Sequence, residues 1–297
     1  MRRLLTGLVA LLLLVGAAIL WLTQPDTLPP DRFAGLEGDA ARGENVFWAA
    51  GCASCHSAEG AEGDDRLVLT GGRRFASEFG TFVAPNISSD PTYGIGNWSL
   101  EAFGNAVMRG VSPDGAHYYP AFPYTAYARM EPQDLVDLYA FMGTLPPADR
   151  PTEPHELAFP FNVRTAAGLW KTLFFEAEGW AVEGDLTPSE TRGRYIAEAL
   201  AHCGECHTPR NALGALETSR WFAGAPNPAG EGRIPNISPA LLHWSREDLV
   251  AYFTYGFTPD FDSAGGSMAE VVQNLAQLPE ADREALADYL LRVAPVQ

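Results

Sequence analysis

Cysteine is scarce in this chain of 297 residues, and all four cysteines stand in two short motifs, CASCH at 52–56 and CGECH at 203–207. A disulfide inside either motif would close only a tiny ring and add little stability. A zinc ribbon also uses two CxxC pairs, but it separates them by about 15–20 residues, whereas about 150 separate these. The cysteines therefore disfavour both a disulfide scaffold and a zinc site.

Positive charge is scarce as well. The chain has 20 Lys and Arg against 37 Asp and Glu, and its net charge is −17. Such a protein repels polyanions, which excludes nucleic acid as a partner. No stretch shows sustained alternation of apolar and polar residues, and this absence disfavours β-strands.

The two cysteine motifs have the CxxCH pattern of a c-type haem attachment site. The two thiols can form thioethers with the vinyl groups of the porphyrin, while the adjacent histidine coordinates the iron. We therefore predict two covalently bound haem c groups. The predicted attachment residues are Cys52, Cys55, Cys203 and Cys206, and the predicted iron ligands are His56 and His207.

An apolar run from Leu4 to Leu22 follows Arg2 and Arg3. As a helix at 1.5 Å per residue, the run spans about 28 Å, which just crosses a bilayer. No small-residue cleavage site follows it, so we favour an uncleaved anchor over residues 1–24 and a linker over 25–37; a cleaved secretory signal is the alternative. Because the arginines would stay in the cytoplasm, we expect a single-pass protein of the bacterial inner membrane with its haem domains in the periplasm.

The same landmarks recur in the same order after each motif, which indicates an internal duplication. We expect two domains, over 38–147 and 185–297, joined by a connector rich in proline and aromatic residues over 148–184. The landmarks are Asn86-Ile87-Ser88, Trp98-Ser99-Leu100-Glu101 and Gly110 in the first copy, and Asn236-Ile237-Ser238, Trp244-Ser245-Arg246-Glu247 and Gly256 in the second.

Helices are expected to lead into both motifs, over 43–50 and 192–201, and to close both copies, over 132–144 and 280–293. Ser99 and Ser245 are expected to cap one further helix in each copy, which ends at Gly110 or Gly256. Long loops rich in glycine and proline can pack around haem, a large apolar plate. The predicted fold is all-α, with an N-terminal transmembrane helix followed by two tandem class I-like cytochrome c domains.

Three segments resemble the cytochrome c subunits of membrane-bound alcohol and gluconate dehydrogenases. They are CHTPRNALGAL at 206–216, LAFPFNVR at 157–164 and YPAFPY at 119–124, and the likeness runs from Gly38 onward. The resemblance implies an electron carrier that works with a dehydrogenase. Two features differ: the best-known members carry three haem domains, whereas this chain has two, and their first domain often reads PAMPY instead of PAFPY.

The sixth iron ligand decides what each haem can do, because a methionine there makes an electron carrier and an open position admits small ligands. Met268 is the only methionine after the second motif, and the resemblance also implies it as the axial ligand. Met108 and Met142 lie in expected helices and are interpreted as core residues. We predict Met130 as the sixth ligand of the first iron, with His117 or an open position as alternatives.

Arg210 is predicted to pair with a propionate of the second haem, because a guanidinium suits a carboxylate. Arg73 and Arg74 are the corresponding candidates for the first haem. The connector is expected to lie across both domains and to bury its aromatic residues, with a partner or quinone contact as the alternative. These aromatic residues are Trp170, Phe174, Phe175 and Trp180, and the histidines expected to be structural or exposed are His155, His202 and His243.

Together these patterns predict a membrane-anchored periplasmic dihaem cytochrome c, an electron carrier and not an enzyme. It would pass electrons from a dehydrogenase or another donor to the respiratory chain. The expected partners are redox proteins, namely a dehydrogenase subunit, an oxidase or a soluble cytochrome. A dihaem peroxidase-like enzyme or a haem-based ligand sensor is the alternative function, and each would need an open sixth position.

Overall fold

The computed structural model describes residues 2–228, 230 and 232–297. Met1, at the start of the predicted anchor, lies outside the described residues, as do Ala229 and Glu231 in the predicted second domain. We call residues 40–146 the first repeat and residues 188–296 the second repeat.

Helices are the main regular elements of both repeats. The first repeat has α2 (Ala40–Ala49), α3 (Cys52–His56), a 3₁₀ turn (Gly63–Leu67), β1 (Arg74–Ser77), β2 (Gly80–Val83), α4 (Leu100–Arg109), α5 (Tyr124–Tyr127) and α6 (Pro132–Met142). The second has α8 (Pro188–Tyr195), a π-helix (Ile196–Leu200), α9 (Cys203–His207), a 3₁₀ turn (Thr218–Arg220), β4 (Ala225–Pro226), β5 (Arg233–Ile234), α10 (Arg246–Tyr255), α11 (Ser267–Leu275) and α12 (Glu280–Arg292).

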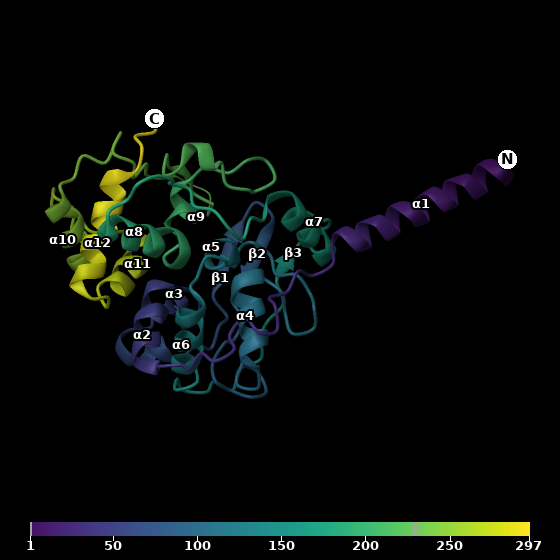
Figure 1. Cartoon of the computed structure of the whole chain (residues 1–297), viewed down its shortest axis with the longest axis horizontal. Coiled ribbons are helices and arrows are strands. Elements are labelled where there is room, and N and C mark those ends of the chain that lie inside the picture. The colour runs from purple at the N-terminus through teal and green to yellow at the C-terminus, as the bar shows by residue number, and fades with distance from the viewer. Residues whose placement is uncertain (1, 229, 231) are drawn as a thin grey trace.

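Helix α1 (Arg2–Leu22) projects from the end of the molecule near α7 (Arg164–Phe174), as Figure 1 shows. Its mean hydropathy is 2.6 and none of it is buried. Among the described residues it is the one helix long and apolar enough to cross a membrane, a test that a signal sequence near the N-terminus also passes.

The predicted helix caps are confirmed in both repeats. The Ser99 side chain accepts from Ala102 N, and Ser245 forms a capping box with Asp248. The helices end at Gly110 and Gly256, whose φ angles of 58° and 76° are in the left-handed region that glycine adopts without a steric penalty. These matching boundaries give α4 and α10 the same length and the same place in their repeats.

Each repeat is held together by two helices that cross at a glycine. Helix α2 packs against α6, and α8 packs against α12. A Cβ atom on Gly43 would lie 2.0 Å from Asp137 O, and one on Gly193 would lie 1.9 Å from Ala285 O. The backbones can approach this closely only because both residues are glycine, and the crossing fixes where the following haem motif begins.

The fold departs from the all-α prediction in two small sheets. Strands β1, β2 and β3 (Glu156–Leu157) form an antiparallel sheet, with Arg74 opposite Val83 and Gly80 opposite Leu157, and β4 pairs with β5. These strands are two to four residues long, too short for alternation to be visible in the sequence. The expected leading helix over 192–201 also differs, since a π-helix replaces its second half.

The connector lies across both repeats and contains a helix, α7, that the sequence did not predict. Trp170 Nε1 donates to Leu213 O at 2.8 Å, and the Phe175 ring contacts the Tyr124 ring at 5.5 Å. Arg194 lies over the Trp180 ring at 4.7 Å. Trp170, Phe174, Phe175 and Trp180 are half-buried, whereas Phe159 and Phe161, earlier in the connector, are 81% and 43% exposed, so the expected burial holds for only part of the connector's aromatic residues.

Candidate haem sites

The two CxxCH motifs form two short helices of the same construction. Helices α3 and α9 each begin after a residue in the left-handed region, Gly51 with φ 68° and His202 with φ 43°. All four cysteines lie in the described part of the chain and are free thiols, so no disulfide joins them. In each helix the first cysteine, the second cysteine and the histidine stand at positions i, i+3 and i+4, which lie on one face of a helix.

The two motif histidines have the same hydrogen bond. His56 Nδ1 lies 2.8 Å from Pro85 O, and His207 Nδ1 lies 2.8 Å from Pro235 O. Because a carbonyl oxygen can only accept, Nδ1 carries the proton in both rings and the Nε2 lone pair is left for a metal. Burial lowers the pKa of His56 to about 4 and also lowers that of His207, so both rings are neutral at pH 7, as an iron ligand must be.

The thiols fit covalent attachment better than metal binding as thiolates. Burial raises the pKa of Cys52 and Cys203 to about 12 and that of Cys55 to about 11. These free thiols are therefore protonated at neutral pH. In the described part of the chain, no three Cys, His, Asp or Glu side chains lie together in a way that could hold a metal ion, as a zinc site requires. Two adjacent thiols and an oriented neutral imidazole, present twice, are the donor set that haem c requires.

Comparisons with known proteins agree with this chemistry. The family model "Cytochrome c" matches residues 40–146. A "Diheme cytochrome c-type" protein of Cereibacter sphaeroides is 59% identical over 297 residues, covering 100% of both chains. This chain belongs to the cytochrome c family.

Other relatives are longer than this chain. The "Fructose dehydrogenase cytochrome subunit" of Gluconobacter japonicus is 38% identical over 97% of this chain and 58% of its own length. The "Gluconate 2-dehydrogenase cytochrome c subunit" of Pantoea cypripedii is 33% identical over 87% of this chain and 62% of its own length. The chain therefore spans about three fifths of the length of these two relatives, both of which are named as cytochrome subunits of dehydrogenases.

The predicted sixth ligands lie at positions that do not correspond between the repeats. Met268 is half-buried in the first turn of α11, and its counterpart in the first repeat, counted from the capping glycine, is Phe122. Met130 is 2% exposed, and its N–H donates to Tyr127 O. Counted from the N-cap of the closing helix, Glu131 in α6 and Pro279 in α12, the counterpart of Met130 is Leu278, which is 4% exposed and bonded in the same way to Leu275 O.

The remaining ligand candidates of the first repeat are buried. Met108 and Met142 are 2% and 5% exposed, in α4 and α6. His117 is 8% exposed, with its Nε2 at 2.8 Å from Thr23 O. That bond directs the ring of His117 toward the segment after α1, while the two methionines pack within the core as expected.

The arginines predicted to meet haem propionates all have carboxylate partners within the protein. Arg210 pairs with Glu205 of the second motif and donates to Gly214 O at 2.7 Å. Arg73 pairs with Glu270 at 2.7 Å, and Arg74 pairs with residues of the connector. Arg210 and Arg73 thus stabilise the haem motifs by contacts within the protein, Arg210 with Glu205 of the second motif and Arg73 with Ser54 of the first.

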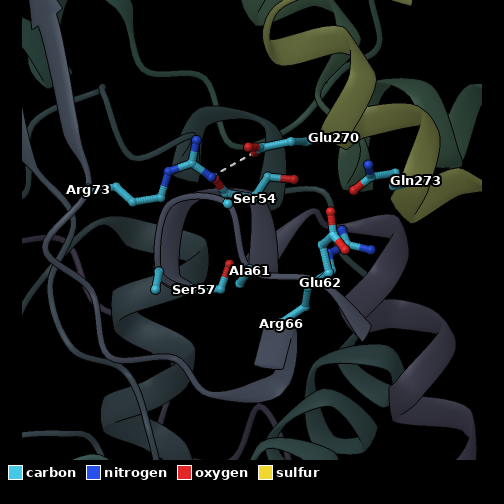
Figure 2. A pocket seen from close by; sticks show the side chains of 10 residues that line it. Ser54, Ser57, Ala61, Glu62, Arg66, Arg73, Glu270 and Gln273 are labelled. Carbon is cyan, nitrogen blue, oxygen red and sulfur yellow. Dashed lines mark hydrogen bonds and ion pairs between the residues drawn. The ribbon is translucent and has the colours of Figure 1, made fainter. Parts of the chain in front are cut away.

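Each haem motif contacts the other repeat across the boundary between them. Asn274 Nδ2 of α11 donates to Ser54 Oγ of α3 at 2.8 Å, and Asn274 also accepts from Arg66. Figure 2 shows the adjoining polar cavity of about 110 Å³, crossed by the Arg73–Glu270 ion pair. On the other side, Thr125 Oγ1 donates to Glu205 Oε1 at 2.7 Å.

Several residues of the sites were not predicted from the sequence. Pro85 and Pro235 supply the carbonyls that orient the histidines. Each directly precedes the repeated Asn-Ile-Ser, so the recurrence of Pro-Asn-Ile-Ser in the sequence could have identified them. His202 is half-buried beside the Tyr127 ring, at 5.7 Å. Glu198, 3% exposed, accepts from Tyr289 and from Ala181 N at 2.7 Å; a buried carboxylate of this kind has no local signal in a sequence.

Proposed function

We propose that this chain is a membrane-anchored dihaem cytochrome c that carries electrons from a periplasmic dehydrogenase toward the respiratory chain. When bound, haem c supplies an iron that gains and loses one electron. The observation that carries the proposal is the repetition of one complete donor set, in which His56 and His207 are oriented by Pro85 and Pro235 in the same way.

The chain's own residues would hold the two groups in place. Cys52, Cys55, Cys203 and Cys206 would form the thioethers, and His56 and His207 would be the fifth ligands. Met268 is proposed as the sixth ligand of the second site and Met130 as that of the first, because a thioether favours the ferrous state and a carrier potential. Arg210, held by Glu205, is near enough in sequence to His207 to serve a propionate as well.

Contact between each attachment helix and the other repeat supports electron transfer within the chain. Ser54 lies between the cysteines of the first motif and is bonded to Asn274 of the second repeat. Glu205 lies between the cysteines of the second motif and accepts a hydrogen bond from Thr125 of the first repeat at 2.7 Å. These hydrogen bonds hold both motifs at the boundary between the repeats, where electron exchange between the two proposed haem sites would take place.

Membrane anchoring rests on α1. The helix is exposed along its whole length, and Arg2 and Arg3 precede its apolar part. By the positive-inside rule these arginines stay in the cytoplasm, so the repeats would lie in the periplasm of a bacterial cell. The cysteines would then be on the side of the membrane where haem c is attached.

The donor is proposed from the relatives. Two of them are named as cytochrome subunits of fructose and gluconate dehydrogenases. The net charge of −17 favours a partner with a cationic docking face. An oxidase or a soluble cytochrome would accept the electrons.

Affinity purification tests this function. The full chain, tagged at its C-terminus, would be isolated from membranes, and the copurifying proteins would be identified. We expect a dehydrogenase to copurify, and we expect its substrate to reduce the haem groups of the chain, as followed by their absorption bands. The double variant Cys203→Ala/Cys206→Ala is the control and should lose half of the reducible haem. If no copurifying protein reduces the wild-type chain, the dehydrogenase partnership is wrong.

A ligand-sensing role for the first haem is the second candidate. It is favoured by Phe122, which occupies the position of Met268, and by Met130, which occupies the position of the core residue Leu278. If Met130 only packs in the core, the first iron is open and the reduced wild-type protein binds carbon monoxide at one haem. If Met130 is the ligand, carbon monoxide binds readily only after Met130→Leu.

A further inference from the structure

A tight hairpin joins α10 to α11 and leads directly to Met268. Phe257 pairs with Ser263 in an antiparallel bridge, and Thr258 N donates to Asp262 O at 2.8 Å. Phe261 N donates to Thr258 O at 2.9 Å, which closes the turn. The hairpin is therefore held by backbone hydrogen bonds, which present the side chains between residues 257 and 263 in a fixed arrangement.

The hairpin exposes large aromatic side chains. Phe261 is 91% exposed and Phe257 is 57% exposed, and Tyr255, just before the hairpin, is 73% exposed. Phe261 also has φ 62°, a conformation that a bulky residue rarely adopts. An exposed phenylalanine in a strained conformation lowers both solubility and stability, and such strain is usually retained for function.

The first repeat contains the same hairpin, but there the paired residues at its base are buried, with Val111 2% and His117 8% exposed, while residues 113–115 at its tip are exposed. Ser112 N donates to Ala116 O at 2.8 Å, and Gly115, with φ 77°, stands where the second repeat has Phe261. His117 bonds to Thr23 O after α1, and Arg164 from the start of α7 donates to His117 O at 3.0 Å. The base of the hairpin is thus packed against other polypeptide in the first repeat and exposed in the second, where the hairpin also carries larger apolar side chains.

The charges beside the aromatic residues indicate what covers the second hairpin. Asp260 and Asp262 are exposed, and neither forms an ion pair with any residue that the structure describes. Two carboxylates around an apolar centre complement an apolar patch rimmed by Lys or Arg. A second copy of this chain is disfavoured as the occupant, because each copy carries a net charge of −17.

We propose that the hairpin 257–263 is the docking surface through which a cationic redox protein exchanges electrons with the second haem. Phe261 and Phe257 would form the apolar centre of the contact, and Asp260 and Asp262 would steer the partner to it. This inference rests on the proposed carrier function, and it adds the site of docking and the chemistry of the partner.

Electron transfer to a basic blue-copper protein tests the docking surface, because its visible band is distinct from the haem bands. The full haem-loaded chain, reduced and kept in one detergent, is mixed with the oxidised probe in a stopped-flow instrument. We expect Asp260→Asn/Asp262→Asn to lower the second-order rate constant about three- to tenfold at low salt and to weaken its dependence on ionic strength. The matched control, Asp64→Asn/Asp65→Asn, removes two exposed carboxylates from the first repeat and should change the rate less than twofold.

Phe261→Gly tests the apolar centre without a risk to folding, because glycine is the residue at the same place in the first repeat. We expect the rate constant to fall about three- to tenfold with an unchanged salt dependence, and the thermal midpoint to stay equal or rise. Leu173→Ala, at a residue 68% exposed on α7, is the apolar control and should leave the rate unchanged.

The outcomes separate the docking surface from the carrier function. If both hairpin variants transfer electrons at the rate of their controls, the docking surface is wrong and the carrier function stands. If the wild-type chain exchanges no electrons with the probe although dithionite reduces both haems, the carrier function itself is contradicted. A wild-type dimer in sedimentation that Phe261→Gly dissociates would overturn the assignment in favour of self-association.

Discussion

Gly193 lies where α8 crosses α12, and we expect Gly193→Ala to destabilise the second repeat. The added Cβ would lie 1.9 Å from Ala285 O and 2.7 Å from Tyr289 Cβ. A carbon and a carbonyl oxygen need about 3.3 Å, so the helices would have to separate by more than about 1 Å. A backbone carbonyl cannot rotate aside as a side chain can.

The size of the effect follows from two opposing terms. Overpacking costs about 1–3 kcal/mol and is expected at the upper end here, because the clash is with backbone. Against this, alanine stabilises a helix by about 1 kcal/mol relative to glycine, because its helix propensity is higher. The net loss of about 2 kcal/mol corresponds to a fall of about 4–8 °C in the thermal midpoint.

The assay is thermal unfolding of the haem-loaded protein, followed by far-UV circular dichroism and by the haem absorption band. Gly143→Ala is the matched control, since its Cβ would have no neighbour closer than 3.4 Å and its φ is −64°. The control should keep or slightly raise the midpoint. An unchanged midpoint in Gly193→Ala would refute the close helix crossing and the placement of the second haem motif that depends on it.

Three further predictions concern the haem sites. Met268→Leu should abolish the near-infrared sulfur-to-iron band of one haem and lower the reduction potential of that haem, whereas the control Met108→Leu should keep the bands of both haems. If Met268→Leu keeps both bands, Met268 is not an iron ligand. Asn274→Leu leaves the buried Arg66 guanidinium without its acceptor and should cost about 1–3 kcal/mol in urea unfolding; an unchanged midpoint would contradict this contact. Burial raises the pKa of Glu198, so the contribution of Glu198 to stability falls as the pH rises from its pKa in the unfolded chain to its pKa in the folded protein. Glu198→Gln should remove this part of the pH dependence from unfolding free energies measured between pH 4 and 8. The same pH dependence in the variant and the wild type would contradict the prediction.

Local signals in the sequence were sufficient for the helices that have caps. Ser99, Ser245, Gly110 and Gly256 confirmed their predicted roles because a cap depends on a few neighbouring residues. The closing helices over 132–144 and 280–293 were predicted to within two residues, since they begin after proline or acidic residues and bury one face. The confirmed features are all short-range.

Features that depend on tertiary contact were not predictable. Strand β3 forms only because the connector returns to β2, about 75 residues after it in the chain. The bond from Asn274 to Ser54 joins residues 220 apart, and no sequence pattern marks such a pair. For the haem sites, the motifs specified the thiols and histidines, while the proline carbonyls that orient the rings required the fold.

Counting the covalently bound haems tests the central claim most directly. The full chain would be produced in a periplasm that matures c-type cytochromes, and its intact mass and haem-stained denaturing gel would be recorded. The proposal predicts the mass of the polypeptide plus two haem groups, and one group fewer in Cys203→Ala/Cys206→Ala. A wild-type chain that carries one haem or none after such maturation would contradict the account.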